Sequence, residues 1–277
     1  MFGAAALALA SGCGGGEDPA AGRAVVAAFY PLAFAAEHVD ATADVTNLTP
    51  AGAEPHDLEL TARDVERVRD AELVLYLRGF VPALDDAVRD SATAVDLLDG
   101  LEPLEGADGK TGVDPHVWLD PMRYAALGER ITEELGETAD AAGFVEELEE
   151  LDRDFRTGLS GCERRTIVTS HAAFGYLADA YGLEQIALTG FSPGAEPSAR
   201  ALEELVAEVE EEGATTVFFE TLVSPELART VAREAGARTA VLDPLEGLTD
   251  EARAAGADYF GVMRENLAAL RSALGCP

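Results

Sequence analysis

Residues 23–39, RAVVAAFYPLAFAAEHV, contain a short apolar run followed by a helical pattern. We interpret the run as a buried strand and the rest as a helix that packs against it. Residues 61–79, TARDVERVRDAELVLYLRG, predict a helix with Thr61 as its N-cap, which leads into another buried strand. Short apolar runs that alternate with helical patterns are typical of a parallel sheet covered by helices.

The second half of the chain repeats this pattern. Residues 164–183, RRTIVTSHAAFGYLADAYGL, predict a strand and then a helix, and residues 198–213 predict an amphipathic helix that ends at Gly213. Residues 122–159, between the two halves, are rich in Glu, Leu, Ala and Arg, which predicts one long helix. The expected fold class is therefore α/β, with two lobes, each a mostly parallel sheet flanked by helices, joined by a long spine helix.

The length of 277 residues suffices for one large or two medium domains. We expect a signal peptide with a flexible tether (1–23), an N-terminal lobe (24–120), a linking spine helix (121–159) and a C-terminal lobe (160–277).

The composition is strongly acidic, with 52 Asp and Glu against 20 Lys and Arg and a formal net charge of −32. This charge excludes a general nucleic-acid binder, because phosphate groups would be repelled. It suits a soluble extracytoplasmic protein or one that handles cations. For most of these carboxylates, a well-solvated acidic surface is a sufficient explanation.

The first 13 residues, MFGAAALALASGC, are apolar but too short to span a bilayer. They are typical of the hydrophobic region of a signal peptide. The small residues before Cys13 resemble the bacterial lipobox, in which the cysteine carries a lipid. No Lys or Arg precedes the apolar run, so the true signal peptide is expected to start further upstream. The alternative is a disordered, Ala- and Gly-rich terminus.

Removal of Cys13 from the three cysteines leaves Cys162 and Cys276. An even pair in an exported protein predicts a disulfide, because the space outside the cytoplasm is oxidising. Two free thiols remain the alternative, because the sequence does not give the separation of the two Cα atoms.

Two of the four histidines, His56 and His116, directly follow a proline in separate predicted loops. His171 lies where a predicted strand gives way to a helix, and Asp243 lies at the end of another strand. Ligands of such α/β folds bind beyond the carboxyl ends of strands. A cleft between the lobes would gather all four residues.

Three imidazoles and one carboxylate form a tetrahedral zinc set. Their wide spacing is not that of a zinc finger, and each residue alone also fits an ordinary loop position. His171 has one physical argument in its favour. At a helix N-terminus the dipole disfavours imidazolium, and a metal needs the neutral ring. The fourth histidine, His38, lies in a predicted helix near Phe34 and is expected to be structural.

Two other classes of function are open at this point. A zinc hydrolase would leave one coordination position to water and place a general base nearby. The chain has no His-Glu-x-x-His helix, Gly-x-Ser-x-Gly elbow or P-loop. A binder of an organic chelate is the third possibility, and the histidine set argues against it.

Five segments together resemble the zinc- and manganese-binding lipoproteins of bacterial ABC importers, the metal-specific class of substrate-binding proteins. The resemblance covers nearly all of the chain after the tether. The segments are FYPLAFAAEHV (29–39), PAGAEPHDLELTARDVERVRDAELVLYLRG (50–79), DPHVWLDP (114–121), SHAAFGYLADAYGL (170–183) and VLDPLEGL (241–248).

The resemblance implies that His56, His116, His171 and Asp243 are the metal ligands. Members of the family with His at the third position are zinc-type, whereas manganese-type members usually have Glu there. His171 therefore favours Zn²⁺, and Mn²⁺ remains possible. The loop 104–113 is short and lacks the His-rich tract of some zinc members, so no auxiliary metal-collecting loop is expected.

The resemblance also implies the setting of the protein. It would be a monomer that is not an enzyme, is anchored by lipid outside the cytoplasm, and delivers metal to an ABC permease and its ATPase. Glu59 and Glu220 are expected near the cleft. Each either accepts a hydrogen bond from a ligand histidine and so orients it, or is an ordinary exposed or capping acid. Trp118 is expected to pack under the His116 loop.

Overall fold

The computed structural model describes residues 22–104, 112–194 and 197–277. Each half of the chain forms a sheet of four strands, all parallel. The strands of the first half are β1 (Ala24–Ala27), β2 (Asp44–Asn47), β3 (Leu73–Tyr76) and β4 (Ala94–Asp96). Those of the second half are β5 (Thr166–Thr169), β6 (Glu184–Ala187), β7 (Thr216–Phe219) and β8 (Arg238–Val241).

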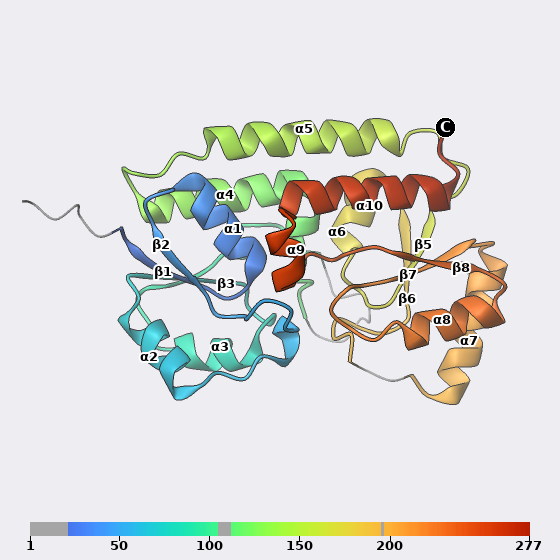
Figure 1. The fold of residues 1–277 in the computed structure, drawn as a ribbon, viewed down its shortest axis with the longest axis horizontal. Helices are drawn as coiled ribbons and strands as arrows, with labels where there is room; N and C mark the ends of the chain where they lie inside the picture. Colours follow the sequence, from blue (N-terminus) through green and yellow to red (C-terminus); the bar gives the residue numbers. More distant parts are fainter. Residues whose placement is uncertain (1–21, 105–111, 195–196) are drawn as a thin grey trace, which may run out of the picture.

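The two sheets have the same connectivity. Their strand orders are β2-β1-β3-β4 and β6-β5-β7-β8. In each sheet the chain forms a central strand first, then the neighbouring edge strand, and then crosses over to form the two strands on the other side. Figure 1 shows the two sheets side by side, each with helices above and below it. The predicted α/β class with two lobes is confirmed.

Helices in the first half follow the strands as the sequence predicts. Thr61 caps the second of them with a complete capping box, in which its side chain and that of Asp64 bond to each other's backbone N–H. The third helix, which begins at a proline, was not foreseen. The helices are α1 (Tyr30–Val39), α2 (Ala62–Asp70) and α3 (Pro82–Val88), with short 3₁₀ turns η1 (Pro55–Asp57) and η2 (Val117–Leu119).

The prediction of one long spine helix is wrong. The segment forms two helices, α4 (Pro121–Leu135) and α5 (Ala142–Gly158). The first ends at Gly136, whose φ of 90° no longer fits a helix. The connection is held by Thr138, whose hydroxyl donates to Asp40 at 2.7 Å. In Figure 1 it is α5 that extends across both lobes, packed against the C-terminal helix α10 (Tyr259–Leu274).

The remaining helices of the second half surround its sheet. The structure joins Cys162, just after α5, to Cys276, just after α10, by a disulfide. The C-terminal ends of α5 and α10 are therefore covalently linked. The other helices are α6 (Gly175–Tyr181), α7 (Ala199–Glu211), α8 (Glu226–Glu234) and α9 (Asp250–Ala254).

An aromatic cluster fills the space where the lobes meet. Trp118 is fully buried, and its ring lies 4.8 Å from that of Phe29 and 5.2 Å from that of Phe80. The Trp118 Nε1 donates to the Pro244 carbonyl oxygen at 2.8 Å, and the Tyr259 hydroxyl donates to the Trp118 carbonyl oxygen. Trp118 thus fixes the loop after His116 to the second lobe.

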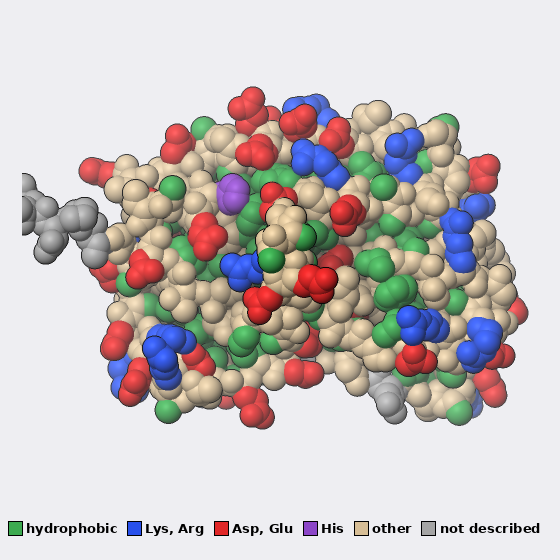
Figure 2. All heavy atoms as spheres, in the orientation of Figure 1, with side chains coloured by type: hydrophobic (Ala, Val, Ile, Leu, Met, Phe, Trp, Pro, Cys, Tyr) green, Lys and Arg blue, Asp and Glu red, His purple; other side chains and the backbone are tan. Residues whose placement is uncertain are grey.

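Acidic side chains outnumber basic ones on the surface. Figure 2 shows Asp and Glu side chains spread over both lobes on the visible face, with fewer Lys and Arg among them. None of the helices in the described ranges is both long and apolar enough to cross a membrane. The expected signal peptide and Cys13 lie outside the described residues.

Candidate metal centre

Side chains with metal-ligating atoms gather at the carboxyl ends of the strands, where both sheets face the junction of the lobes. His171 follows β5 by two residues, and Glu220 follows β7 directly. Glu246 follows β8, His56 lies in the 3₁₀ turn after β2, and His116 immediately precedes η2. The placement is the one expected for ligands of parallel sheets.

His116 is buried and is held twice by Asp114, which is itself held by the second lobe. Its Nδ1 donates to Asp114 at 2.8 Å, and its backbone N–H donates to the same carboxylate oxygen at 2.9 Å. The Tyr176 hydroxyl, from the second lobe, donates to the Asp114 carbonyl oxygen at 2.8 Å. Because Nδ1 carries a proton, the neutral ring keeps its lone pair on Nε2, the atom that a metal binds.

His171 has the same arrangement with a different partner. It is fully buried, and its Nδ1 donates to Glu220 Oε1 at 2.8 Å. The Ser170 hydroxyl donates to the same oxygen, which holds the carboxylate in place. Glu220, one of the two acids expected near the cleft, thus accepts a hydrogen bond from His171. Glu59, the other acid suggested for this role, is exposed and belongs to neither of the metal-ligand groups in the described residues.

His56 lies at the rim of the site. Its side chain keeps 8% of its surface exposed, and its backbone N–H donates to Glu54 at 3.2 Å. The loop that carries it is tied to the second lobe by the Gly52 N–H, which donates to the Leu248 carbonyl oxygen at 3.1 Å. The rim imidazole is thus held through its backbone and through the lobe contact.

Glu246 completes the group. Its Oε1 lies 3.3 Å from His56 Nε2, 3.2 Å from His116 Nε2 and 3.0 Å from His171 Nε2. One ligand atom from each of these four residues lies within 4.8 Å of the others. Three imidazole nitrogens and one carboxylate oxygen are the donors of a four-coordinate zinc site.

The structure places Asp243 outside this group, which differs from the sequence-based expectation. Its Oδ1 accepts from the Leu245 N–H at 2.8 Å, and its Oδ2 accepts from the Thr221 hydroxyl at 2.7 Å. Asn266 bonds to its backbone on both sides, donating from Nδ2 and accepting at Oδ1. Asp243 therefore shapes the turn that presents Glu246.

That turn contains Leu245, the one non-glycine residue with positive φ in the described part of the chain, at 57°. A β-carbon in this conformation costs on the order of 1 kcal/mol or more. The residue is buried, so packing on all sides offsets the cost. Backbone strain of this kind is often found at functional sites, and this leucine directly precedes Glu246.

The electrostatics of the site also correct one sequence argument. Burial alone would lower the pKa of His171, but the carboxylates of Glu246 and Glu220 raise it to about 10. The helix dipole does not act on His171 as expected, because α6 begins only at Gly175.

Burial opposes ionisation of Glu246 as well, yet the imidazoles around it hold its pKa well below the usual range. Burial and the nearby Glu246 carboxylate raise the pKa of Glu54 to about 8.

His38 lies away from the site, as expected. It is exposed in the last turn of α1, donates from Nδ1 to the Phe34 carbonyl oxygen at 2.9 Å and stacks near that ring.

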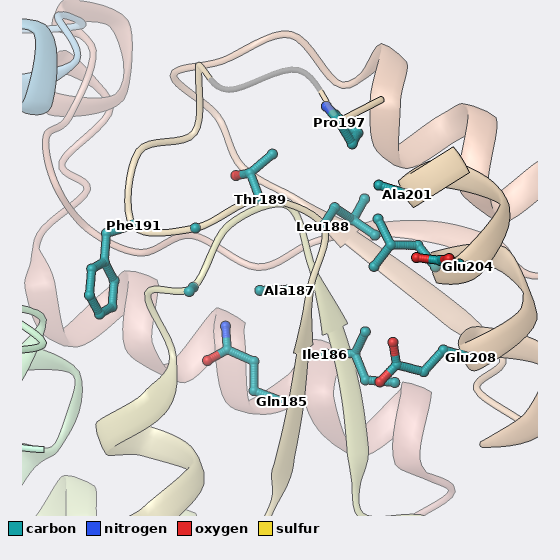
Figure 3. A pocket seen from close by; sticks show the side chains of 13 residues that line it. Gln185, Ile186, Ala187, Leu188, Thr189, Phe191, Pro197, Ala201, Glu204 and Glu208 are labelled. Carbon is teal, nitrogen blue, oxygen red and sulfur yellow. The ribbon is translucent and has the colours of Figure 1, made fainter. Parts of the chain in front are cut away.

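A separate pocket of about 490 Å³ adjoins the site between β6 and α7. Figure 3 shows Ile186 and Leu188 on its strand side, Glu204 and Glu208 on its helix side, and Phe191 apart from them at one end. The Phe191 ring lies 5.8 Å from that of His116. Phe191 therefore lines this pocket and also packs beside His116.

The family model described as "Zinc-uptake complex component A periplasmic" matches residues 25–273. The chain belongs to this family. The high-affinity zinc uptake system protein ZnuA of Bacillus subtilis (strain 168) is 33% identical over 277 residues, which cover 90% of this chain and 87% of that protein. The zinc-binding lipoprotein AdcA of Streptococcus pneumoniae (strain R6) is 40% identical over 274 residues, which cover 89% of this chain and 55% of AdcA. The chain thus spans about half the length of the AdcA proteins it matches.

Solved structures of the family have the same fold. The Zn(II)-bound ZnuA-like domain of Streptococcus pneumoniae AdcA has a TM-score of 0.77 and 36% identity, covering 91% of this chain and 99% of that one. The laminin-binding protein of Streptococcus agalactiae, described as having adhesin and metal-transporting activity, has a TM-score of 0.81 and 30% identity, covering 91% and 99%.

Proposed function

We propose that the chain captures one zinc ion outside the cytoplasm and delivers it to the permease and ATPase of an ABC importer. The observation that carries the proposal is the convergence of His56, His116, His171 and Glu246 on one buried point. Zinc is the cargo, because three imidazoles and one carboxylate suit it better than manganese, which prefers hard oxygen ligands.

The proposed ligand set includes Glu246 in place of Asp243. The carboxylate of Asp243 already accepts hydrogen bonds from Leu245 and Thr221, whereas Oε1 of Glu246 lies within 3.3 Å of all three Nε2 atoms. The proposed ligands divide evenly between the lobes, so bound zinc would also hold the lobes together. Four protein ligands fill a tetrahedral site, which suits carriage better than hydrolysis.

The proposed setting is a monomer anchored by lipid at Cys13. The lipobox-like sequence supports it, as does the name of the AdcA lipoprotein of Streptococcus pneumoniae. A Cys13→Ser variant should leave the membrane fraction or remain unprocessed in the source bacterium. A processed, membrane-bound variant would contradict the anchor without touching the zinc site.

The function is tested by titrating metal-free protein with zinc in a calorimeter and by measuring growth in low zinc after deletion of the gene. We expect one equivalent bound, and restored growth with the wild-type gene but not with His116→Ala. The matched control is His38→Ala, which removes an imidazole outside the site and should bind and restore growth normally. Equal zinc binding by wild type and His116→Ala would refute the proposal.

A further inference from the structure

The buried turn that leads to His116 rests against the beginning of α6, a helix of the second lobe. The Tyr176 hydroxyl donates to the Asp114 carbonyl oxygen at 2.8 Å and accepts from the Leu104 N–H at 3.0 Å. The Asp114 N–H in turn donates to the Leu104 carbonyl oxygen at 3.0 Å. Tyr176 is fully buried, so its hydroxyl ties two backbone segments of the first half of the chain to the second lobe.

Gly175, the residue before Tyr176, lets the side chain of Asp114 lie close to the helix. A β-carbon placed on Gly175 would lie 2.7 Å from Asp114 Oδ2, well inside van der Waals contact. The other oxygen of this carboxylate, Oδ1, accepts from the backbone N–H and from Nδ1 of His116. Because a carboxylate is one rigid planar group, an atom that displaced Oδ2 would also move Oδ1 away from the imidazole.

The partners of the Tyr176 hydroxyl distinguish it from a tyrosine that only fills the core. Both of its hydrogen bonds go to backbone groups of the segment that precedes His116. Tyr181, at the other end of α6, is also buried, but its hydroxyl donates to Asp152 of α5 at 3.2 Å, away from the metal centre. The same short helix therefore carries one tyrosine that supports the site and one that does not.

We propose that Gly175 and Tyr176 are positioning residues for zinc binding, which hold Asp114 and through it keep His116 Nε2 directed at the metal. The proposal rests on the proposed function, because it takes His116 as a zinc ligand. Partners that fix the ring of a ligating histidine strengthen metal binding. Here the support comes from the opposite lobe, so the orientation of His116 depends on contact between the lobes.

The first test is Tyr176→Phe, which removes the hydroxyl and keeps the ring. We expect its zinc affinity, measured by competition with a chelator, to fall by about tenfold. The absorption spectrum of the Co²⁺-loaded protein should also change, because that spectrum reports the geometry of the ligands. Tyr181→Phe is the matched control. It loses a buried hydroxyl from the same helix and should keep the zinc affinity and the Co²⁺ spectrum of the wild type.

The second test, Gly175→Ala, separates positioning from folding. Alanine favours a helix more than glycine does, so α6 itself is not weakened, whereas the added β-carbon would displace the Asp114 carboxylate. We expect a loss of zinc affinity of about tenfold. The control is Gly143→Ala in α5, where an added β-carbon meets nothing within 4 Å.

A double-mutant cycle shows whether both residues act through Asp114. In an Asp114→Ala background, neither Tyr176→Phe nor Gly175→Ala should lower zinc affinity much further, because the carboxylate that they hold is gone. Thermal melting of each metal-free variant confirms that it folds.

Wild-type zinc affinity and Co²⁺ spectrum in either Tyr176→Phe or Gly175→Ala would overturn the role of that residue. Equal losses in the matched controls, or undiminished losses in the Asp114→Ala background, would overturn the proposal as a whole. Failure of the wild type to bind zinc would instead overturn the proposed function, and this role with it.

Discussion

The interior and the rim of the metal centre hold their imidazoles in different ways. His116 and His171 have no exposed surface, and each donates from Nδ1 to a carboxylate at 2.8 Å. His56 keeps some exposure, and the contact that orients its segment is made by its backbone N–H. The two interior rings are thus each oriented by a carboxylate at Nδ1, whereas the rim ring has no such contact among the described residues and is held mainly through its backbone. We therefore expect zinc affinity to depend more on the interior pair than on His56.

The largest effect expected from this difference lies in removal of the imidazoles themselves. His116→Ala should weaken zinc binding by more than the 10–100-fold that outer-shell changes cause, because it removes a preorganised ligand. His56→Ala should weaken it less and mainly speed zinc dissociation. Competition against a chromogenic chelator and stopped-flow release measure both quantities. A greater loss in His56→Ala than in His116→Ala would reverse the assignment of interior and rim.

The next effect separates the two acids of the turn after β8. Glu246→Gln replaces a charged ligand with a neutral amide and should reduce zinc affinity by at least about tenfold. Asp243→Asn keeps an oxygen that accepts from the Leu245 N–H, so its zinc affinity should stay close to that of wild type. Both are measured by the same chelator competition. A large loss in Asp243→Asn with little change in Glu246→Gln would restore Asp243 as the ligand.

A smaller loss should follow when the support of an interior ring is weakened. Asp114→Asn removes the charge that orients His116, and such changes commonly cost 10–100-fold in metal affinity. Glu54→Gln alters the contact at the rim and should cost less zinc affinity. Calorimetric titration of the two variants compares the supports directly. Equal losses would show that the interior ring is no better fixed than the rim ring.

The dependence of zinc affinity on pH sharpens the comparison further. His171 has a pKa of about 10 without metal, so it is protonated at neutral pH, and zinc must displace that proton. Apparent affinity should therefore rise with pH up to about 10, by about tenfold per unit for each proton displaced. Titrations in buffers with different ionisation enthalpies count the protons released. An affinity that does not change between pH 6 and pH 9 would contradict this view.

The sequence predicted the two sheets and the three histidines of the site, but neither the break at Gly136 nor the position of Glu246. Apolar runs and helical periodicity predicted both sheets, and the three histidines expected beyond strand ends are the ones that the structure brings together. The break at Gly136 was missed because a glycine is tolerated within a helix and only the tertiary contact of Thr138 with Asp40 shows the turn.

Glu246 was missed for a related reason. Asp243 ends a strand and precedes proline, which made it the obvious carboxylate. The turn that brings Glu246 to the histidines depends on a leucine in the left-handed region, and leucine gives no local signal for that conformation. Asp114 offered a readable signal, since an acid two residues before His116 can accept from its backbone N–H.

The most direct test of the zinc centre is a crystal structure of the zinc-loaded protein with anomalous diffraction recorded at the zinc edge. The account predicts one strong peak about 2.0–2.2 Å from Nε2 of His56, His116 and His171 and from a carboxylate oxygen of Glu246. A zinc ion ligated by Asp243, or bound away from the three histidines, would contradict it.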